Sequence, residues 1–149
     1  MKDIGHISAF IGKINKQIIP NIIKANEETA KQVQEDVIAN APMGTGKYKE
    51  SIKVYPTEIK NGKISTEIGT EMMVGDYNLG FLLENGTDPH MIYPKNSPVL
   101  AFEIDGITIF AKKVNHPGFR AIPHFKPALD KNEKTYLDNI DKAIKEAEK

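Results

Sequence analysis

The sequence predicts an α+β fold: a long N-terminal helix, an antiparallel sheet of two hairpins, and a C-terminal helix packed on that sheet. Apolar residues recur every three or four positions over the first forty residues, which is the period of one helical face. Asn61-Gly62 and Asp105-Gly106 each separate two β-like runs, and such dipeptides favour two-residue hairpin turns. After Pro127 the composition becomes helix-forming again. The 149 residues, 40% of them hydrophobic, suit a single domain, 1–149.

The N-terminal helix is the strongest secondary-structure signal. Its apolar stripe comprises Ile4, Ile7, Ile11, Ile14, Ile18, Ile22, Ala25, Thr29, Val33 and Val37. An unbroken helix from Ile4 to Asn40 would be about 55 Å long, longer than one small domain covers, and Pro20 lies inside it. We therefore expect a kink or break near Pro20, with residues 1–24 forming a protruding helical arm or packing on another chain. A helical hairpin folded back at Pro20 is the alternative.

A turn should follow this helix. Ala41-Pro42-Met43-Gly44 ends it because proline disfavours helical geometry in the residue before it. Thr45 can then cap a single helical turn over 47–51.

The Asn61-Gly62 turn fixes a strand register. It sets Ile59 opposite Ile64, Thr57 opposite Thr66 and Tyr55 opposite Ile68. In that register Ile52 and Val54 would face away from the core. A bulge near Pro56 would return them, since one extra residue restores the alternation.

The Asp105-Gly106 turn sets the register of a second hairpin in the same way. It pairs Ile104 with Ile107, Phe102 with Ile109 and Leu100 with Ala111 on one face, with Glu103 and Thr108 on the other. We expect Phe102 and Ile109 to form a core pair. Between the hairpins the residues 77–85 fit either a helix or a strand, and 86–98 reads as a long loop, a feature that usually binds something.

Residues 114–129 form a proline-rich strap before the last helix. Pro117, Pro123 and Pro127 interrupt regular structure until the helix begins. Its apolar side chains, Val114, Phe119, Ile122, Phe125 and Leu129, are too many for a loop in water. We expect the strap to pack over the core or against a neighbouring subunit.

Composition excludes several classes of function. Twenty acidic and twenty basic residues give a formal charge of zero, so no long-range field attracts nucleic acid or anionic lipid. Cysteine is absent, which removes disulfides, thiolate metal sites and thiol nucleophiles. No apolar run approaches the roughly 20 residues that span a bilayer, and no signal peptide is apparent. We expect no membrane partner, no cofactor and a cytoplasmic site of synthesis.

One cluster could carry metal or acid–base chemistry. It consists of Glu84, Asp88, His90, His116 and His124. Their spacing matches no common zinc signature, and we expect surface or capping histidines and no metal or catalytic site. A metal-dependent hydrolase built on these residues is the first alternative function.

A second alternative is a nucleic-acid-binding module. Lys47, Lys49 and Lys53 interleave with Tyr48, as basic and aromatic residues do in single-strand binders. A solvated lysine face before an edge strand is the preferred interpretation. Residues 84–87 read as a tight turn in which Gly86 supplies a positive φ.

Four motifs in order resemble the minor tail component, or tail-completion, family of long-tailed bacteriophages, over residues 25 to 130. They are A-N-A-P-M-G-T-G-K-Y-K-E-S-I, G-F-L-L-E-N-G-T, I-Y-P-K-N-S-P-V-L-A-F and H-P-G-F-R-A-I-P-H-F-K-P-A-L. Matching residues include Pro42, Thr45, Gly46, Glu84, Gly86, Thr87, Pro117, Gly118, Pro123 and Pro127, which we expect to be structural. Tyr48 stands where the family has leucine, and His124 is inserted between Pro123 and Phe125.

The resemblance implies a non-enzymatic virion protein at the head–tail junction, assembled in the host cytoplasm. It further implies a ring, expected to be a hexamer, that contacts head-connector and tail proteins and through which genome DNA could pass without specific recognition. The residues we expect at subunit or partner contacts are Asp88, His90, Met91, His116, Phe119 and Arg120.

Overall fold

The structure, a computed structural model, describes residues 8, 11–44 and 46–147. Ile4, Ile7 and Thr45, which carried sequence-based expectations, lie outside this part of the chain. The elements are η1 (Ile14–Ile18), α2 (Ile19–Asn40), α3 (Lys47–Ser51), β1 (Lys53–Val54), β2 (Glu58–Lys60), β3 (Lys63–Ser65), β4 (Ile68–Gly69), β5 (Met73–Val74), β6 (Tyr77–Asn78), α4 (Leu79–Asn85), β7 (His90–Ile92), β8 (Leu100–Ile104), β9 (Ile107–Ala111), β10 (Val114–His116) and α5 (Phe125–Ala147). The predicted α+β class is confirmed.

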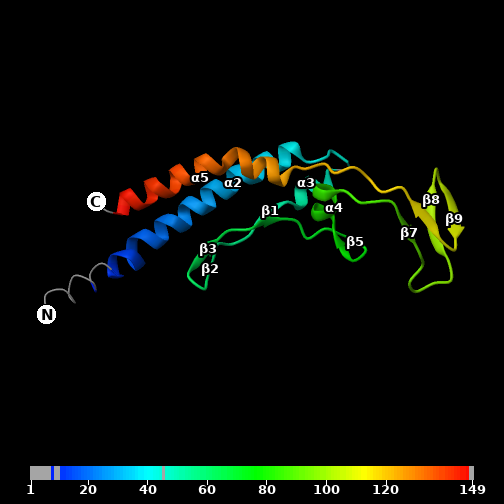
Figure 1. The fold of residues 1–149 in the computed structure, drawn as a ribbon, viewed down its shortest axis with the longest axis horizontal. Coiled ribbons are helices and arrows are strands. Elements are labelled where there is room, and N and C mark those ends of the chain that lie inside the picture. Colours follow the sequence, from blue (N-terminus) through cyan, green and yellow to red (C-terminus); the bar gives the residue numbers. More distant parts are fainter. Residues whose placement is uncertain (1–7, 9–10, 45, 148–149) are drawn as a thin grey trace.

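Two long helices, α2 and α5, lie antiparallel along the molecule, over the strands of the first hairpin (Figure 1). Their hydrogen bonds fix the direction. Asn21 Nδ2 donates to the Ala143 carbonyl oxygen (3.2 Å), near the start of α2 and the end of α5. At the other end Asn132 Nδ2 donates to the Asp36 carboxylate (2.7 Å). The buried apolar residues between them are small, Ala25, Ala30, Val33 and Val37 on α2 and Ala128, Ala143 and Ala147 on α5, so the backbones can approach closely.

The helix is not broken at Pro20. Residues Ile14–Ile18 are π-helical, and the Ile19 N–H bonds the Ile14 carbonyl oxygen five residues back. A proline in a helix lacks its N–H and clashes with the carbonyl four residues earlier, and a π turn is one of the local changes that relieve this. The helix runs without interruption from Ile14 through Pro20 to Asn40. The expected break and the helical-hairpin alternative are therefore both wrong, and the chain accommodates Pro20 with a π-helical segment before it.

The hydrophobic core lies where the end of α2, the short helix α3 and the start of α5 meet. Its buried residues are Val33, Val37, Ala41, Tyr48, Ile52 and Ala128. The single turn expected over 47–51 is present as α3, and it begins after Gly46, whose φ is 82°.

Within the described residues the strands form five separate two-stranded antiparallel pairs rather than one continuous sheet. In the first hairpin Asn61 and Gly62 both have positive φ, as a type I′ turn requires, and Ile59 pairs with Ile64 as predicted. Thr57 and Thr66 are also opposite, with hydroxyl oxygens 2.7 Å apart.

The predicted bulge near Pro56 is present. Val54, and not Tyr55, is opposite Ile68. Between that pair and the Thr57–Thr66 pair, two residues, Tyr55 and Pro56, therefore oppose the single residue Glu67. The extra residue shifts the register by one, which is why the expected pairing of Tyr55 with Ile68 is wrong.

The second hairpin has the predicted register and an unexpected location. Phe102 pairs with Ile109 and Ile104 with Ile107. The β8–β9 hairpin, however, projects at the far end of the molecule from the helices (Figure 1), and Ile104 and Ile107 are 50% and 67% exposed. Phe102 and Ile109 are consequently not a core pair, because alternation defines a common face without supplying anything to cover it.

The region between the two hairpins contains both a short strand and a helix. Residues 77–85 are a short strand followed by α4, which Asn78 caps by accepting a hydrogen bond from the Phe81 N–H (3.1 Å). The expected loop 86–98 contains strand β7, which pairs with β10, so the expectation of a structureless loop is wrong there. In the described part of the chain, no helix has the length and apolar character needed to cross a membrane.

Candidate assembly surface

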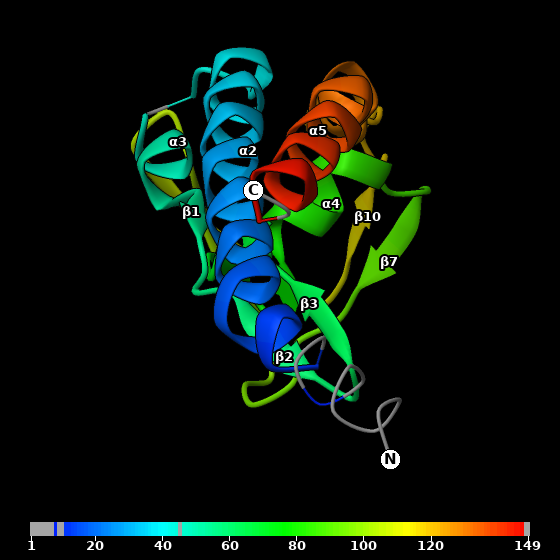
Figure 2. The same cartoon turned by 90° about the vertical axis from the view of Figure 1, so that its left-hand side faces the viewer.

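Most of the predicted contact residues are brought together where two distant segments cross, 84–92 and 114–124, which we call the strand crossing. His90 is opposite His116, and Met91 is opposite Asn115. Two backbone hydrogen bonds then join Thr87 to Phe119, at 3.0 and 3.1 Å. Figure 2 shows β7 and β10 side by side, separate from the helices.

Two glycines make the strand crossing possible. Gly86 has a φ of 72°, and a Cβ there would lie 2.7 Å from the Phe119 carbonyl oxygen. Gly118 has a φ of 75°, and its Cβ would lie 2.2 Å from the Thr87 carbonyl oxygen. The positive φ of Gly86 was predicted. The close backbone approach, which excludes any side chain at either position, was not.

Glu84 connects the strand crossing to α5. Its carboxylate accepts hydrogen bonds from the backbone N–H groups of His124, Phe125 and Lys126, at 2.8, 3.0 and 2.9 Å. These are N–H groups of the first helical turn, which have no partner inside the helix. Burial alone would raise the pKa of Glu84, but the three N–H donors outweigh it and hold that pKa below its usual range. Sequence reasoning missed this role because the carboxylate and its donors are forty residues apart.

His124 is fully buried, so the expectation of a surface or capping histidine is wrong for it. Its Nδ1 donates a hydrogen bond to the Ile122 carbonyl oxygen (2.7 Å). Its Nε2 therefore carries no proton and accepts a hydrogen bond from the Tyr48 hydroxyl, 2.6 Å away. Burial, with the negative charge of Glu84, raises the pKa of Tyr48 to about 12. The two departures from the family pattern, Tyr48 and His124, thus contact each other.

This contact weakens the nucleic-acid alternative. Tyr48 is buried and cannot stack on a base, although Lys47 and Lys53 are exposed. The aromatic side chain that the nucleic-acid interpretation needs on the lysine-rich surface is therefore not available.

The histidines and carboxylates of the proposed metal cluster lie in two places. Glu84 and His124 are engaged at the start of α5. His90 and His116 lie on the β7–β10 pair with ring centroids 5.0 Å apart, and His90 Nδ1 donates to the Asp88 carbonyl oxygen (2.8 Å). Among the described residues no three His, Asp or Glu side chains are placed to hold a metal ion. The residues of the proposed metal cluster are thus not brought together as one site.

The other residues predicted as contacts or as structural motif positions lie at the surface or next to helix ends. Met91, Phe119 and Arg120 are exposed. Pro42 follows the C-cap of α2, and Pro127 lies in the first turn of α5. Pro117 and Pro123 are exposed on either side of the Phe119 contact.

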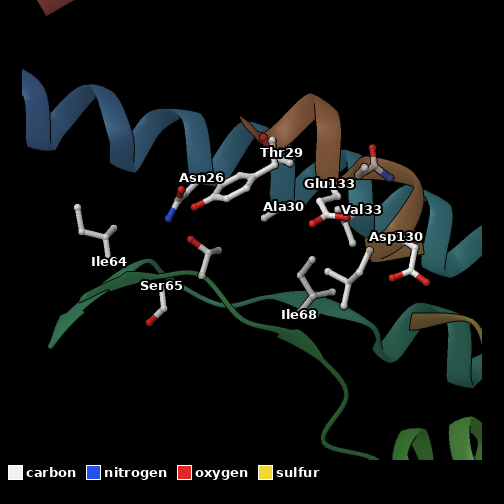
Figure 3. Close-up of a pocket in the computed structure, with 13 residues that line it drawn as sticks. Asn26, Thr29, Ala30, Val33, Ile64, Ser65, Ile68, Asp130 and Glu133 are labelled. Atoms are coloured by element: carbon white, nitrogen blue, oxygen red, sulfur yellow. The ribbon is translucent and has the colours of Figure 1, made fainter. Parts of the chain in front are cut away.

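A groove that no sequence motif predicted lies under the helices. It encloses about 450 Å³ between α2, α5 and the β3–β4 segment (Figure 3). Its apolar lining comprises Ala30, Val33, Ile64, Ile68, Leu129 and Tyr136. Asn26 also lines it, and the Asn26 Oδ1 is buried with no hydrogen-bond partner among the described residues.

Comparison with known families decides the broad identity. A family model described as "Bacteriophage HK97-gp10, putative tail-component" matches residues 6–86, more than half of the chain. The chain belongs to this HK97-gp10-like family of phage tail components. No curated protein and no solved structure matches the chain. The tail component is thus a structural protein of a phage virion, and its matched span runs through α2 and ends at Gly86, inside the first segment of the strand crossing.

Proposed function

We propose that this tail component is a non-enzymatic subunit of a ring, expected to be a hexamer, that completes the tail and joins it to the head. In this role it contacts itself, a head-connector protein and the tail, and genome DNA passes through the ring without specific recognition. One observation carries the proposal: the β8–β9 hairpin projects from the body with large apolar side chains open to solvent.

Such exposure points to an assembly contact. Contiguous exposed apolar surface on a soluble protein marks a binding surface, and protein interfaces place apolar and aromatic side chains at their centres. Besides Ile104 and Ile107, Phe110 is 66% exposed on the same hairpin. A subunit that remained alone would gain nothing from this arrangement.

We further propose that the strand crossing supplies a partner contact. The residues are Asp88, His90, Met91, His116, Phe119 and Arg120, all on or beside the β7–β10 pair. Aromatic side chains, methionine and arginine are enriched at interfaces, and the backbone hydrogen bonds that hold Phe119 leave its side chain partly exposed.

The chain is proposed to act as one domain with residues 1–24 as a helical arm. In the described part of that segment, Ile11 is exposed while Asn21 is hydrogen-bonded to α5. The arm would therefore extend from a base that is fixed to the body.

Deletion of the gene from the phage that encodes this chain tests the proposal. Electron microscopy of the lysate should show DNA-filled heads and separate tails of normal length, and plasmid-supplied protein should restore joined particles. Absent tails, or tails of abnormal length, would instead indicate a role in building the tail tube. Normal infectious particles would remove the joining role altogether.

A further inference from the structure

The β8–β9 hairpin presents one apolar face along its length. Phe102, Ile104, Ile107 and Ile109 lie on this face, and the two nearest the turn are at least half exposed. The opposite face carries Glu103 and Thr108 near the turn and, farther from it, Ala101 opposite Phe110. The hairpin spans five residues a side, which is about 17 Å of strand.

The groove under α2 and α5, of about 450 Å³, is lined mainly by apolar side chains. It lies between the helices and the β3–β4 segment, at a distance from the hairpin of its own chain (Figures 1 and 3). Ile64 lies at one end of it and Asp130 at the other (Figure 3). In the structure the hairpin of the same chain lies apart from it (Figure 1).

The charges of the two surfaces define one orientation. The charged residues that line the groove, Asp130 and Glu133, are both acidic, whereas Lys63 precedes Ile64 at the other end. On the hairpin, Asp105 lies in the turn and Lys112 and Lys113 follow the base of β9. With its turn toward Ile64, the hairpin would bring the two lysines to the acidic end.

We propose that the β8–β9 hairpin of one copy occupies the α2–α5 groove of the next copy, with its turn at the Ile64 end. This inference rests on the proposed ring. The two surfaces differ and lie on separate parts of one chain, so each copy offers a hairpin and receives one. Such a head-to-tail contact closes into a ring when the rotation between copies allows it.

Disulfide trapping in assembled particles tests the proposal, because the natural chain has no cysteine. The variant Ile107→Cys/Tyr136→Cys places one thiol near the hairpin turn and one on the groove wall, at positions 67% and 38% exposed. After oxidation of purified virions we expect covalent oligomers on a non-reducing gel, and a disulfide-linked peptide pair joining residues 107 and 136. These residues lie on separate elements at a distance within one chain (Figure 1), so the bond must join two copies.

The matched control is Thr108→Cys/Tyr136→Cys, which moves the hairpin thiol to the opposite face of β9. It should remain monomeric on the same gel. Absence of a 107–136 link in virions that contain the chain would overturn the proposal, as would linkage of residue 107 only to a second residue 107 or to another phage protein.

A charge exchange provides a second measurement that needs no cysteine. Lys112→Glu/Lys113→Glu should lower the yield of infectious particles, and so should Asp130→Lys/Glu133→Lys. Combining the two pairs should restore much of the yield, since attraction is re-established with the signs reversed. Losses that simply multiply would overturn the proposed orientation.

The outcomes separate this inference from the proposed function. A ring seen at the head–tail junction without a 107–136 bond would contradict the hairpin–groove contact but support the ring. A 107–136 bond in a phage whose heads and tails also join without this chain would support the contact but contradict the joining role.

Discussion

Regular spacing of apolar residues leads to burial in α2, at one end of the molecule, and to exposure in the β8–β9 hairpin, at the other end. The helical stripe of α2 leads to buried residues, with Val37 fully enclosed by α5 and α3. The equally regular alternation of β8 and β9 leads to an exposed hairpin. Periodicity therefore identifies which residues share a face. Whether that face is buried in its own chain depends on elements far away in sequence, and here one face is covered and the other is left open.

The strongest test of this difference uses two glycines with nearly the same φ. Gly118, at the strand crossing, has a φ of 75°, and Gly106, in the hairpin turn, has a φ of 78°. A Cβ at Gly118 would lie 2.2 Å from backbone, whereas nothing lies within 4 Å at Gly106. Gly118→Ala should lower the free energy of unfolding by about 3 kcal/mol, and Gly106→Ala by about 1 kcal/mol.

Urea unfolding monitored by circular dichroism measures both changes. Equal losses in the two variants would show that the strand crossing opens readily, and that only the backbone conformation matters at these positions. Gly86→Val should resemble Gly118→Ala, because a Cβ at Gly86 also meets backbone atoms at 2.7 Å.

The second comparison concerns truncation of apolar side chains. Val37→Ala, in the core, should lower the free energy of unfolding by about 2 kcal/mol. Ile107→Ala, at a site 67% exposed, should change it by under about 0.5 kcal/mol in the isolated chain. A large loss from Ile107→Ala in a monomeric sample would mean that the hairpin folds back on its own chain in solution.

The third prediction uses pH to examine the start of α5. The pKa of Glu84 is lowered in the folded state by three N–H donors, so its stabilisation is present above the ordinary carboxyl pKa of about 4.3 and is lost as pH falls through the lower folded value. Glu84→Gln should cost about 1 kcal/mol at pH 7. Thermal melts from pH 7 to pH 3 should show this difference shrinking below pH 4, and a constant difference would indicate a purely steric effect.

A fourth prediction concerns the pair that departs from the family pattern. Tyr48→Phe removes the hydroxyl that lies 2.6 Å from His124 Nε2 and leaves a buried nitrogen without its partner. We expect a loss of about 1 kcal/mol in unfolding free energy. Tyr77→Phe is the control, since that tyrosine is 65% exposed, and a similar loss there would show that the buried hydrogen bond contributes nothing specific.

Local rules predicted much of this fold from the sequence. The Asn61-Gly62 and Asp105-Gly106 turns gave both hairpin registers, because turn geometry fixes pairing within a few residues. The bulge near Pro56 followed from the need to keep one face apolar.

Contacts between distant segments could not be predicted in the same way. The capping of α5 by Glu84, the burial of His124 against Tyr48 and the close approach of Gly118 to Thr87 each join residues more than thirty positions apart. The resemblance to phage tail components marked Glu84, Gly86 and Gly118 as motif residues, and the structure supplies the physical reason for each. The hairpin face and the groove carried no motif at all.

The smallest expected effect on stability is at Arg120, beside the strand crossing. Its side chain is exposed, so Arg120→Glu should change the unfolding free energy by no more than about 0.5 kcal/mol. If the strand crossing contacts a partner, the reversed charge should nevertheless prevent assembly, because like charges across an interface are strongly disfavoured. Phe119→Asp should act in the same direction, with a larger loss of stability because that side chain is only partly exposed. Complementation of a phage that lacks the gene, with circular dichroism of each purified variant, measures both properties. Normal plating by both variants would show that the strand crossing is only an internal joint between α4 and α5, and that the assembly surfaces are confined to the hairpin and the groove.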